Sequence, residues 1–218
     1  MTFRDLNLKK PLWNALDELG YHTPTTIQAN GFKVMMSGAD TIGIAQTGTG
    51  KTLAYLLPCL CMWEFSKGPH PQILIIVPTR ELVAQVVREV EKLTTYMNVV
   101  VGGVYGGTNM NTQAVMVLNG LDVLVGTPGR ILDLAISGSL KLKHIKKVVI
   151  DEVDETLSLG FRTQLLNLFE FLPAKRQHLV FSATLSEEVE LFLEDYLISP
   201  VRVEAARAGS PIDKIHQS

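Results

Sequence analysis

Short apolar runs alternate with helical segments along most of this chain. Six runs are continuously apolar, as strands buried on both faces of a sheet are. They span Thr41–Ile44, Ile73–Val77, Val99–Val104, Val123–Val125, Val148–Ile150 and Leu179–Phe181. The segments between them, such as Glu81–Tyr96 and Arg130–Ser137, are long enough for crossover helices. The alternation predicts an α/β fold, with a mainly parallel β-sheet and helices on both of its faces.

Two helices are predicted ahead of the first strand. The first has Asn7 as its cap, Pro11 near its first turn and Gly20 after its end. Its leucines recur at helical spacing, at Leu8, Leu12, Leu16 and Leu19. The second helix is predicted over about Thr25–Ser37, and it stops at Gly38.

Each predicted strand leads directly into a polar or glycine-rich segment. In chain order these segments read AQTGTGKT, PTRE, YGGT, GTPGR, DEVD and SATL. The carboxyl ends of parallel strands lie at one edge of the sheet, and ligands of open parallel sheets bind outside that edge. The sequence therefore predicts a catalytic face there.

The first of these segments, Ala45–Thr52, has the composition of a phosphate-binding loop between a strand and a helix. Gly48 and Gly50 allow a turn in which successive N–H groups converge on phosphate oxygens, and the following helix adds the positive end of its dipole. Lys51 is expected to reach the β- and γ-phosphates, and the Thr52 hydroxyl to ligate Mg²⁺. The alternative is a glycine-rich turn without a ligand.

The segment Asp151–Asp154 supplies carboxylates at the end of a buried strand. Asp151 is expected to hold Mg²⁺, and Glu152 is expected to orient and deprotonate the attacking water. Taken alone, DEVD also fits a solvated turn. Beside a phosphate loop, adjacent carboxylates that stay charged near a triphosphate make sense with a metal ion between them.

The composition limits the class of protein and its cellular compartment, but it does not indicate a binding partner. The chain is 46% hydrophobic and 19% charged, enough apolar material for a large core, and its net charge of −2 gives no global attraction to nucleic acid. Cys59 and Cys61 are expected to be buried free thiols, which suits a reducing compartment. The start of the chain lacks an apolar signal core, and the longest apolar run, Leu53–Trp63, is too short for a bilayer. A soluble, cytoplasmic protein is predicted.

In their order along the chain, these motifs resemble the first RecA-like domain of DEAD-box ATP-dependent RNA helicases. AQTGTGKT matches the Walker A motif of that family, DEVD stands in place of DEAD, and SAT is present. PTREL, the Gly106-Gly107 pair and TPGR match its RNA-facing motifs. The resemblance covers almost the whole chain and implies a RecA-like P-loop NTPase fold that uses ATP and Mg²⁺. The family's Q motif is matched by Phe3, Gly20-Tyr21, Pro24-Thr25 and Ile27-Gln28.

Two departures from the family pattern stand out. Val153 replaces the alanine of DEAD but leaves the three acids in place. Motifs IV, V and VI, which belong to a second RecA-like domain in the family, are absent. The resemblance therefore implies that residues 1–204 are the ATP-binding domain, including the Q-motif region. Residues 205–218 lose apolar periodicity and gain Gly, Ser and Pro, and they are expected to be a linker to a missing second domain.

For the nucleotide, the resemblance assigns roles residue by residue. Tyr21 stacks on adenine, and the Gln28 amide accepts from adenine N6 and donates to N7, a pairing that guanine does not allow. By spacing alone, Gln28 fits a surface residue of a helix, and Tyr21 fits a loop aromatic folded onto the core. The nucleotide contacts are expected at Tyr21, Gln28, Gln46, Thr47, Gly48, Thr49, Gly50, Lys51 and Thr52, the catalytic residues are Lys51, Asp151 and Glu152, and the Mg²⁺ ligands, partly through water, are Thr52 and Asp151.

For RNA, the resemblance implies a sequence-independent grip on the backbone of a single strand. Alternatives remain, because Arg80 can pair with Glu81 or Glu89 and Thr-Pro-Gly can be a simple turn. The residues assigned to RNA are Pro78, Thr79, Arg80, Gly106, Gly107, Thr127, Pro128, Gly129 and Arg130.

Ser182 and Thr184 are implied to bond the acids of DEVD, including Asp154, and to couple nucleotide state to domain closure. The alternative is capping of a helix that starts near Glu187, for which Ser186 is also a candidate. Two charged groups are predicted to be solvated. They are the basic run Lys141, Lys143, Lys146 and Lys147, and the acidic face Glu187, Glu188, Glu190 and Glu194.

The full-length protein is expected to be a monomer that hydrolyses ATP. RNA-stimulated domain closure would separate short duplexes or remodel RNA–protein contacts, with arginine fingers from the second domain. Two rivals remain. A DNA helicase or another two-domain translocase shares the phosphate loop and the acids but does not need the Gln28 constellation. A non-catalytic, nucleotide-gated RNA-binding module is disfavoured by the intact Lys51, Asp151 and Glu152.

Overall fold

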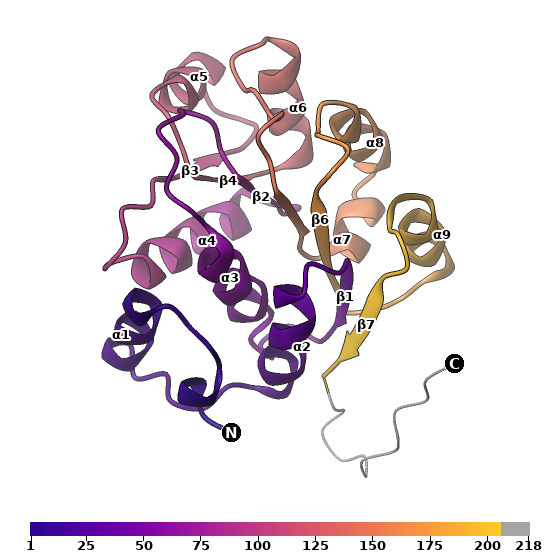
Figure 1. The fold of residues 1–218 in the computed structure, drawn as a ribbon. Helices are drawn as coiled ribbons and strands as arrows, with labels where there is room; N and C mark the ends of the chain where they lie inside the picture. Colours follow the sequence, from indigo (N-terminus) through magenta and orange to yellow (C-terminus); the bar gives the residue numbers. More distant parts are fainter. Residues whose placement is uncertain (206–218) are drawn as a thin grey trace.

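The computed structural model describes residues 1–205, and in this part of the chain seven parallel strands form one sheet (Figure 1). The order across the sheet is β3-β4-β2-β5-β6-β1-β7. The strands are β1 (Thr41–Ile44), β2 (Ile73–Ile76), β3 (Val101–Val104), β4 (Val123–Gly126), β5 (Lys147–Ile150), β6 (Gln177–Ser182) and β7 (Val201–Glu204).

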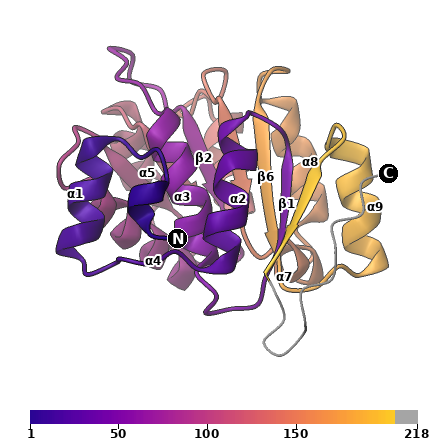
Figure 2. The ribbon, with the colours of Figure 1, turned by 60° about the horizontal axis from the view of Figure 1, so that its bottom comes forward.

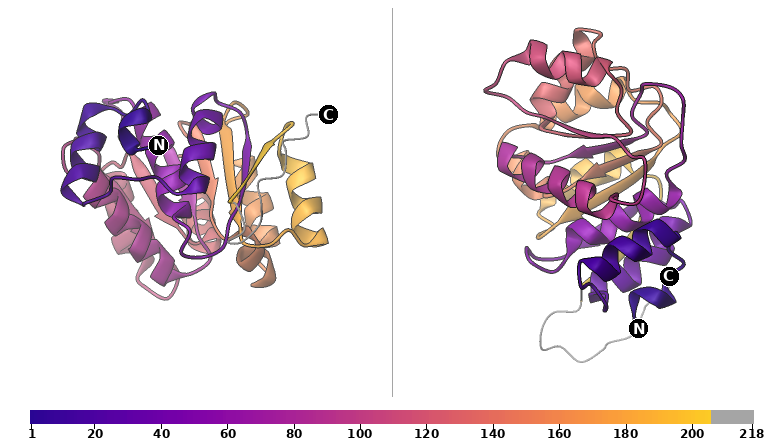
Figure 3. Two further views of the ribbon diagram at one scale, coloured as in Figure 1. Left: turned by 90° about the horizontal axis from the view of Figure 1, so that it is seen from below. Right: turned by 90° about the vertical axis from the view of Figure 1, so that its left-hand side faces the viewer.

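Helices cover both faces of the sheet, so that the sheet lies between two helical layers (Figure 3). One layer contains α1 (Lys10–Glu18), α2 (Thr26–Met36), α3 (Lys51–Met62) and α4 (Arg80–Leu93), preceded by a 3₁₀ turn, η1 (Phe3–Asp5). The other contains α5 (Met110–Leu118), α6 (Pro128–Ile136), α7 (Val153–Ser158), α8 (Arg162–Glu170) and α9 (Glu187–Tyr196).

Alternate residues of the central strands belong to two separate cores. In β2, Ile73 and Ile75 pack into the core under α1–α4, whereas Leu74 and Ile76 pack into the core under α5–α9. All four side chains are at most 2% exposed. Full burial of one such side chain stabilises a fold by about 1.5–3 kcal/mol. Burial on both faces explains why these strands are continuously apolar, and the predicted α/β fold is confirmed.

The six predicted strands are confirmed to within two residues at their ends, whereas β7 was missed. This strand lies at the edge of the sheet and pairs only with β1, from Thr41 opposite Val201 to Ile44 opposite Glu204. Its sequence, VRVE, alternates, and of its four residues Val203 alone is buried. An edge strand with one covered face does not give the continuously apolar signal. The predicted linker lies, apart from Ala205, outside the described residues.

Three local predictions need correction. Asn7 does not cap the first helix, because α1 begins at Lys10 and Lys9 occupies the cap position, although Pro11 does lie in its first turn. Lys147 is not solvated, because it begins β5 and is buried. The helix predicted from Glu81 to Tyr96 ends at Leu93, and Thr94 is its C-cap.

The N-terminal segment, which includes η1 and α1, packs against the helical layer and does not extend into solvent. Figure 2 shows α1 and α2 beside α3, in front of the sheet. The N–H of Phe3 donates to the carbonyl of His22, at 3.1 Å, which ties η1 to the loop between α1 and α2. Cys59 and Cys61 are buried free thiols, as predicted. Within residues 1–205, no helix has the length and apolar character needed to cross a bilayer.

Candidate functional site

The order of the strands sorts the six polar loops into two neighbouring groups. Strands β5, β6 and β1 are adjacent, and they deliver DEVD, SATL and the glycine-rich loop to one part of the edge. Strands β3, β4 and β2 are also adjacent, and they deliver YGGT, GTPGR and PTRE to the other part. Because all of these strands are parallel, both groups lie at the carboxyl edge of the sheet.

The glycine-rich loop has the backbone conformation of an anion cradle. Gly48 and Gly50 have φ angles of +82° and +87°, in the left-handed region that favours glycine. A Cβ at Gly50 would also lie 2.4 Å from the Nε2 atom of Gln28, so this position requires glycine for a second reason. Helix α3 begins at Lys51 without a side-chain cap, which leaves its first N–H groups for a ligand.

Lys51 is a buried cation without a protein partner. Its residue is 6% exposed, and its amino group makes no hydrogen bond to the described residues. It faces a cavity of about 330 Å³ that is also lined by Thr47, Glu152 and Asp154. Since an uncompensated buried charge is costly, this arrangement suits an anionic ligand.

Glu152 lines the same cavity, whereas Asp151, at the end of β5, is more deeply buried. Burial raises the pKa of Asp151, an effect that the charge of Lys51 opposes. Burial, a hydrogen bond with Glu155 and the charge of Asp151 together raise the pKa of Glu152 to about 7. A carboxyl group with this pKa can exchange protons at neutral pH, as a general base must. Glu152 also has a φ angle of +52°, a strained conformation typical of functional positions.

A fully buried phenol lies close to Asp151. Tyr55 of α3 packs against Phe181, with ring centroids 5.3 Å apart, and its hydroxyl faces Asp151 and Thr52. Burial raises the pKa of Tyr55 well above its ordinary value, and the neighbouring charge of Asp151 adds to this effect. The phenol therefore stays neutral. Sequence analysis did not single out Tyr55, because a tyrosine in an apolar helix gives a core signal.

The SAT segment is joined to DEVD through one carboxylate. The backbone N–H and the hydroxyl of Thr184 both donate to Oδ2 of Asp154, at 3.1 and 2.9 Å. Burial raises the pKa of Asp154, but hydrogen bonds led by that of Thr184 outweigh it, and the pKa lies below its ordinary value. The hydroxyl of Ser182 donates to the carbonyl of Thr184, at 2.6 Å, and it also helps to lower the pKa of Asp154. Ser186 caps α9, accepting from the N–H of Val189.

Gln28 is buried rather than on the surface, and it fastens α2 to the glycine-rich loop. Its Oε1 atom accepts from the N–H of Thr25 at 2.9 Å, and its Nε2 atom donates to the carbonyl of Gly50 at 3.0 Å. The residue is 5% exposed. An amide has two acceptor sites and two donor hydrogens, so one of each remains for a base edge.

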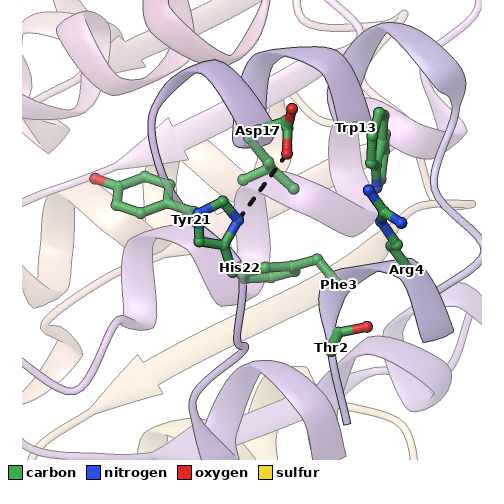
Figure 4. Close-up of a pocket in the computed structure, with 8 residues that line it drawn as sticks. Thr2, Phe3, Arg4, Trp13, Asp17, Tyr21 and His22 are labelled. Atoms are coloured by element: carbon green, nitrogen blue, oxygen red, sulfur yellow. Dashed lines mark ion pairs between the residues drawn. The ribbon is translucent and has the colours of Figure 1, made fainter.

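Tyr21 projects from the protein instead of folding onto the core, and it is 40% exposed. Next to it is a pocket of about 290 Å³, lined among others by Phe3, Trp13 and His22 (Figure 4). In this pocket the guanidinium of Arg4 lies over the Trp13 ring, 4.9 Å from its centroid. The matched Q-motif residues thus gather around the loop between α1 and α2.

In the second group of loops, the two candidate arginines differ sharply. The side chain of Arg80 is 67% exposed and makes one ion pair, with Glu81, at 2.9 Å. Arg130 is 9% exposed, and its guanidinium bonds Gln113 and the carbonyl of Thr108. Of the other residues assigned to RNA, the three glycines are at least partly exposed, at Gly106, Gly107 and Gly129. Two residues at the start of α6 are buried, Thr127 and Pro128. Before α4, Pro78 is buried, and the next residue, Thr79, caps the helix.

Comparison with known proteins identifies the family to which a chain with this site belongs. Residues 25–192 match the family model described as DEAD/DEAH box helicase. The chain belongs to this family. It is 36% identical to eukaryotic initiation factor 4A of Dictyostelium discoideum over 216 residues, 99% of this chain and 53% of that protein. It is 38% identical to the ATP-dependent RNA helicase RhlB of Shewanella frigidimarina (93% and 48%) and 37% identical to the ATP-dependent RNA helicase DeaD of Escherichia coli (96% and 34%).

The helicase-family chain spans about half of the length of the first two of these relatives, and about a third of the third. The matched region includes the phosphate loop, the DEVD segment and both groups of loops. The seven-stranded parallel sheet and its two helical layers agree with the RecA-like fold that the resemblance implied.

Proposed function

We propose that this domain binds ATP with Mg²⁺, and that the protein to which it belongs hydrolyses ATP to separate short RNA duplexes or remodel RNA–protein complexes. The observation that carries the proposal is Lys51, a buried ammonium group beside the glycine-rich loop that makes no hydrogen bond within residues 1–205. Triphosphate oxygens supply the missing negative charge. Relatives of this chain that are named ATP-dependent RNA helicases support the same assignment.

The nucleotide residues divide by chemistry. The N–H groups of residues 46–52 and the amino group of Lys51 bind the phosphates, and Tyr21 and Gln28 bind the adenine ring. Support for the adenine site comes from Gln28, whose amide keeps a free donor and a free acceptor while it holds Gly50. The cavity of about 330 Å³ at Lys51 leaves room for the phosphate end.

Mg²⁺ fits this site as a shared ligand of protein and nucleotide. Within residues 1–205, no group of three or more His, Cys, Asp or Glu side chains is placed to hold a metal ion. Mg²⁺ characteristically uses one or two carboxylates together with substrate phosphates and water. Asp151 and the hydroxyl of Thr52 are the proposed protein ligands, and the metal ion would neutralise charge on the phosphates. Glu152, with its pKa of about 7, is the proposed base for the attacking water.

RNA is proposed to bind along the second group of loops. Exposed glycine N–H groups at Gly106 and Gly107, the N-terminus of α6 and the exposed Arg80 suit phosphates without reading bases. Because the net charge of the chain is −2, attraction for RNA must be local. The bond from Thr184 to Asp154 supports the proposed link between the nucleotide site and domain closure.

A second RecA-like domain, reached through a linker that begins near residue 205, is proposed to supply the arginine fingers and the other half of the RNA site. We propose that the protein acts as a monomer. Cys59 and Cys61, both buried and reduced, support a cytoplasmic location.

The test is steady-state ATPase activity of residues 1–218, with and without single-stranded RNA. Because an arginine finger typically contributes about 10³–10⁵ in rate, this chain should bind nucleotide yet barely hydrolyse it, and RNA should not stimulate the residual rate. Strong RNA-stimulated turnover by the monomeric fragment would rule out the two-domain mechanism.

The rival functions need the full-length protein. A DNA helicase or other translocase predicts stimulation by DNA at least as strong as by RNA, and no preference for adenine over guanine nucleotides. A non-catalytic binding module predicts no turnover at all. Relatives named ATP-dependent RNA helicases favour the RNA helicase over the first rival, and the raised pKa of Glu152 favours catalysis over the second.

A further inference from the structure

Gln113 lies outside every motif matched above, yet its side chain is surrounded by them. It belongs to α5 and is 8% exposed. Its Oε1 atom accepts from Nη1 of Arg130 at 2.8 Å and from the N–H of Tyr105 at 3.3 Å. Its Nε2 atom donates to the hydroxyl of Thr108 at 2.8 Å and to the carbonyl of Tyr105 at 3.2 Å. These four contacts use the full capacity of a side-chain amide.

Arg130 completes the same network from α6. Its Nη2 atom donates to the carbonyl of Thr108 at 3.0 Å, in addition to the bond from Nη1 to Gln113. Its Nε atom lies 3.8 Å from Asp133, too far for a normal hydrogen bond. With 9% exposure, the guanidinium points its fork into the protein, whereas phosphate recognition by arginine needs that fork to face the ligand.

The segment held by this network is the loop 105–108 after β3. Gly106 and Gly107 are exposed, a Cβ at either would meet nothing within 4 Å, and Gly107 has a φ angle of +78°. Two exposed glycines give a loop wide conformational freedom, which costs entropy when the loop binds a ligand. The contacts to Tyr105 and Thr108 fix both ends of the loop.

We propose that Gln113 and Arg130 are a pair of positioning residues. Together they hold the loop 105–108 in the conformation in which the N–H groups of Gly106 and Gly107 bind RNA phosphate, and Arg130 itself is not a phosphate ligand. The inference deepens the proposed RNA-binding function and rests on it. It also changes the role expected from the sequence for Arg130, while Arg80 remains a phosphate ligand.

The first experiment measures amide hydrogen exchange by NMR at Tyr105, the loop residue whose N–H donates to Gln113, in residues 1–218 without RNA. Gln113→Ala and Arg130→Lys should each accelerate exchange in this loop about ten-fold, the usual effect of a lost hydrogen bond of about 1.4 kcal/mol. Thr112→Ala, an exposed change on the same turn of α5, is the matched control and should leave exchange unchanged. Unchanged loop exchange in both test variants would overturn the inference whatever RNA does.

The second experiment measures the affinity for a fluorescent single-stranded oligouridylate and its dependence on salt. If Arg130 neutralised a phosphate, Arg130→Ala would flatten the salt slope by about 0.7, and Arg130→Lys would keep both slope and affinity. As positioning residues, Gln113→Ala, Arg130→Ala and Arg130→Lys should each weaken binding about ten-fold with the slope unchanged. The double variant Gln113→Ala/Arg130→Ala should bind no more weakly than either single variant, because one network is lost in each.

Two controls distinguish a variant that misfolds, a wrong role for Gln113 and Arg130, and a wrong RNA site. Gln113→Met keeps most of the side-chain volume but has no strong donor or acceptor for Tyr105 and Thr108, so it should fold even where alanine does not, and it should still free the loop. Arg80→Ala should flatten the slope in the same assay. A flattened slope for Arg130→Ala together with full affinity for Gln113→Ala would overturn the inference. Absence of RNA binding by the wild type would instead refute the proposed RNA site, and loop exchange alone would then decide whether the pair holds the loop.

Discussion

Lys51 and Lys147 are both buried, and they lie at opposite edges of the same sheet. Lys51 follows the carboxyl end of β1 and has no partner among the described residues. Lys147 begins β5, and its amino group donates to Oε1 of Gln177. The Nε2 atom of Gln177 in turn donates to the carbonyls of Met35 and Ala39, at 2.9 and 2.7 Å.

The same contrast extends to the carboxylates. At the amino edge, Asp40 accepts from the N–H groups of His178 and Ile198, at 2.7 and 3.2 Å. At the carboxyl edge, burial raises the pKa values of Asp151 and Glu152. A buried polar group without a partner costs stability, and it is kept where a ligand will satisfy it. The amino edge therefore stabilises the fold, whereas the carboxyl edge holds uncompensated charge for a nucleotide and a metal ion.

The largest expected effect is on the unpaired lysine. Lys51→Ala should weaken MgATP binding about 100-fold or more, since charged contacts worth about 3 kcal/mol are lost. Glu152→Gln should keep binding, because Glu152 is assigned to the attacking water rather than to phosphate. Isothermal calorimetric titration measures both. Equal losses of affinity in the two variants would contradict the assigned roles.

The opposite edge should respond in stability instead of binding. Gln177→Leu leaves the buried Lys147 ammonium without its acceptor and removes the hydrogen bonds to the carbonyls of Met35 and Ala39, and it should lower the free energy of unfolding by about 3 kcal/mol. Its affinity for ADP, measured on the folded protein, should not change. Lys51→Met is the matched comparison, because the Lys51 amino group makes no hydrogen bond to the described residues, and it should lower stability in urea much less than Gln177→Leu does. A large loss of stability in Lys51→Met would remove the contrast between the two edges.

Gln28 is expected to contribute both to nucleotide binding and to stability, so one variant tests both effects. Gln28→Ala should reduce the preference for ADP over GDP by about 1–3 kcal/mol, the usual worth of a bidentate base contact. Because Gln28 also completes the capping box of α2, the variant should lose about 1 kcal/mol of stability. Titration with both nucleotides, beside a urea unfolding curve, separates the effects. Equal affinity of the wild type for GDP and ADP would refute the adenine site.

The smallest expected effect is on the stability of the protein at acidic pH, through the carboxylate of Asp40. Burial raises the pKa of Asp40, but hydrogen bonds from His178 and Ile198 outweigh it, and the pKa lies below its ordinary value of 3.8. Stability from this group is therefore complete above pH 3.8 and is lost as pH falls through the lower folded-state pKa. Between pH 5 and pH 3, the wild type should lose slightly more stability than Asp40→Asn, which has no carboxylate to titrate. Parallel curves for the two proteins would show that Asp40 is not stabilised by these bonds.

Much of the fold and of the nucleotide site could be predicted because both depend on local signals. Continuously apolar runs placed six strands, and the strand-to-helix position of Gly48, Gly50 and Lys51 placed the phosphate loop. By contrast, β7 was missed because an edge strand such as VRVE exposes alternate residues. The sequence wrongly predicts Lys147 to be solvated, because a lysine at the start of a strand gives no sign of the glutamine that pairs with it.

By itself, the sequence determined the types and order of most secondary-structure elements and the residues at the ends of six strands, since these follow from periodicity and backbone preference over a few neighbours. Tertiary structure alone decided which groups find partners. Gln113 and Arg130 are 17 residues apart, and Gln177 and Met35 are 142 apart. Crossovers of the parallel sheet bring such residues together, and hydrogen bonding and burial then determine that Arg130 faces inward while Arg80 faces solvent.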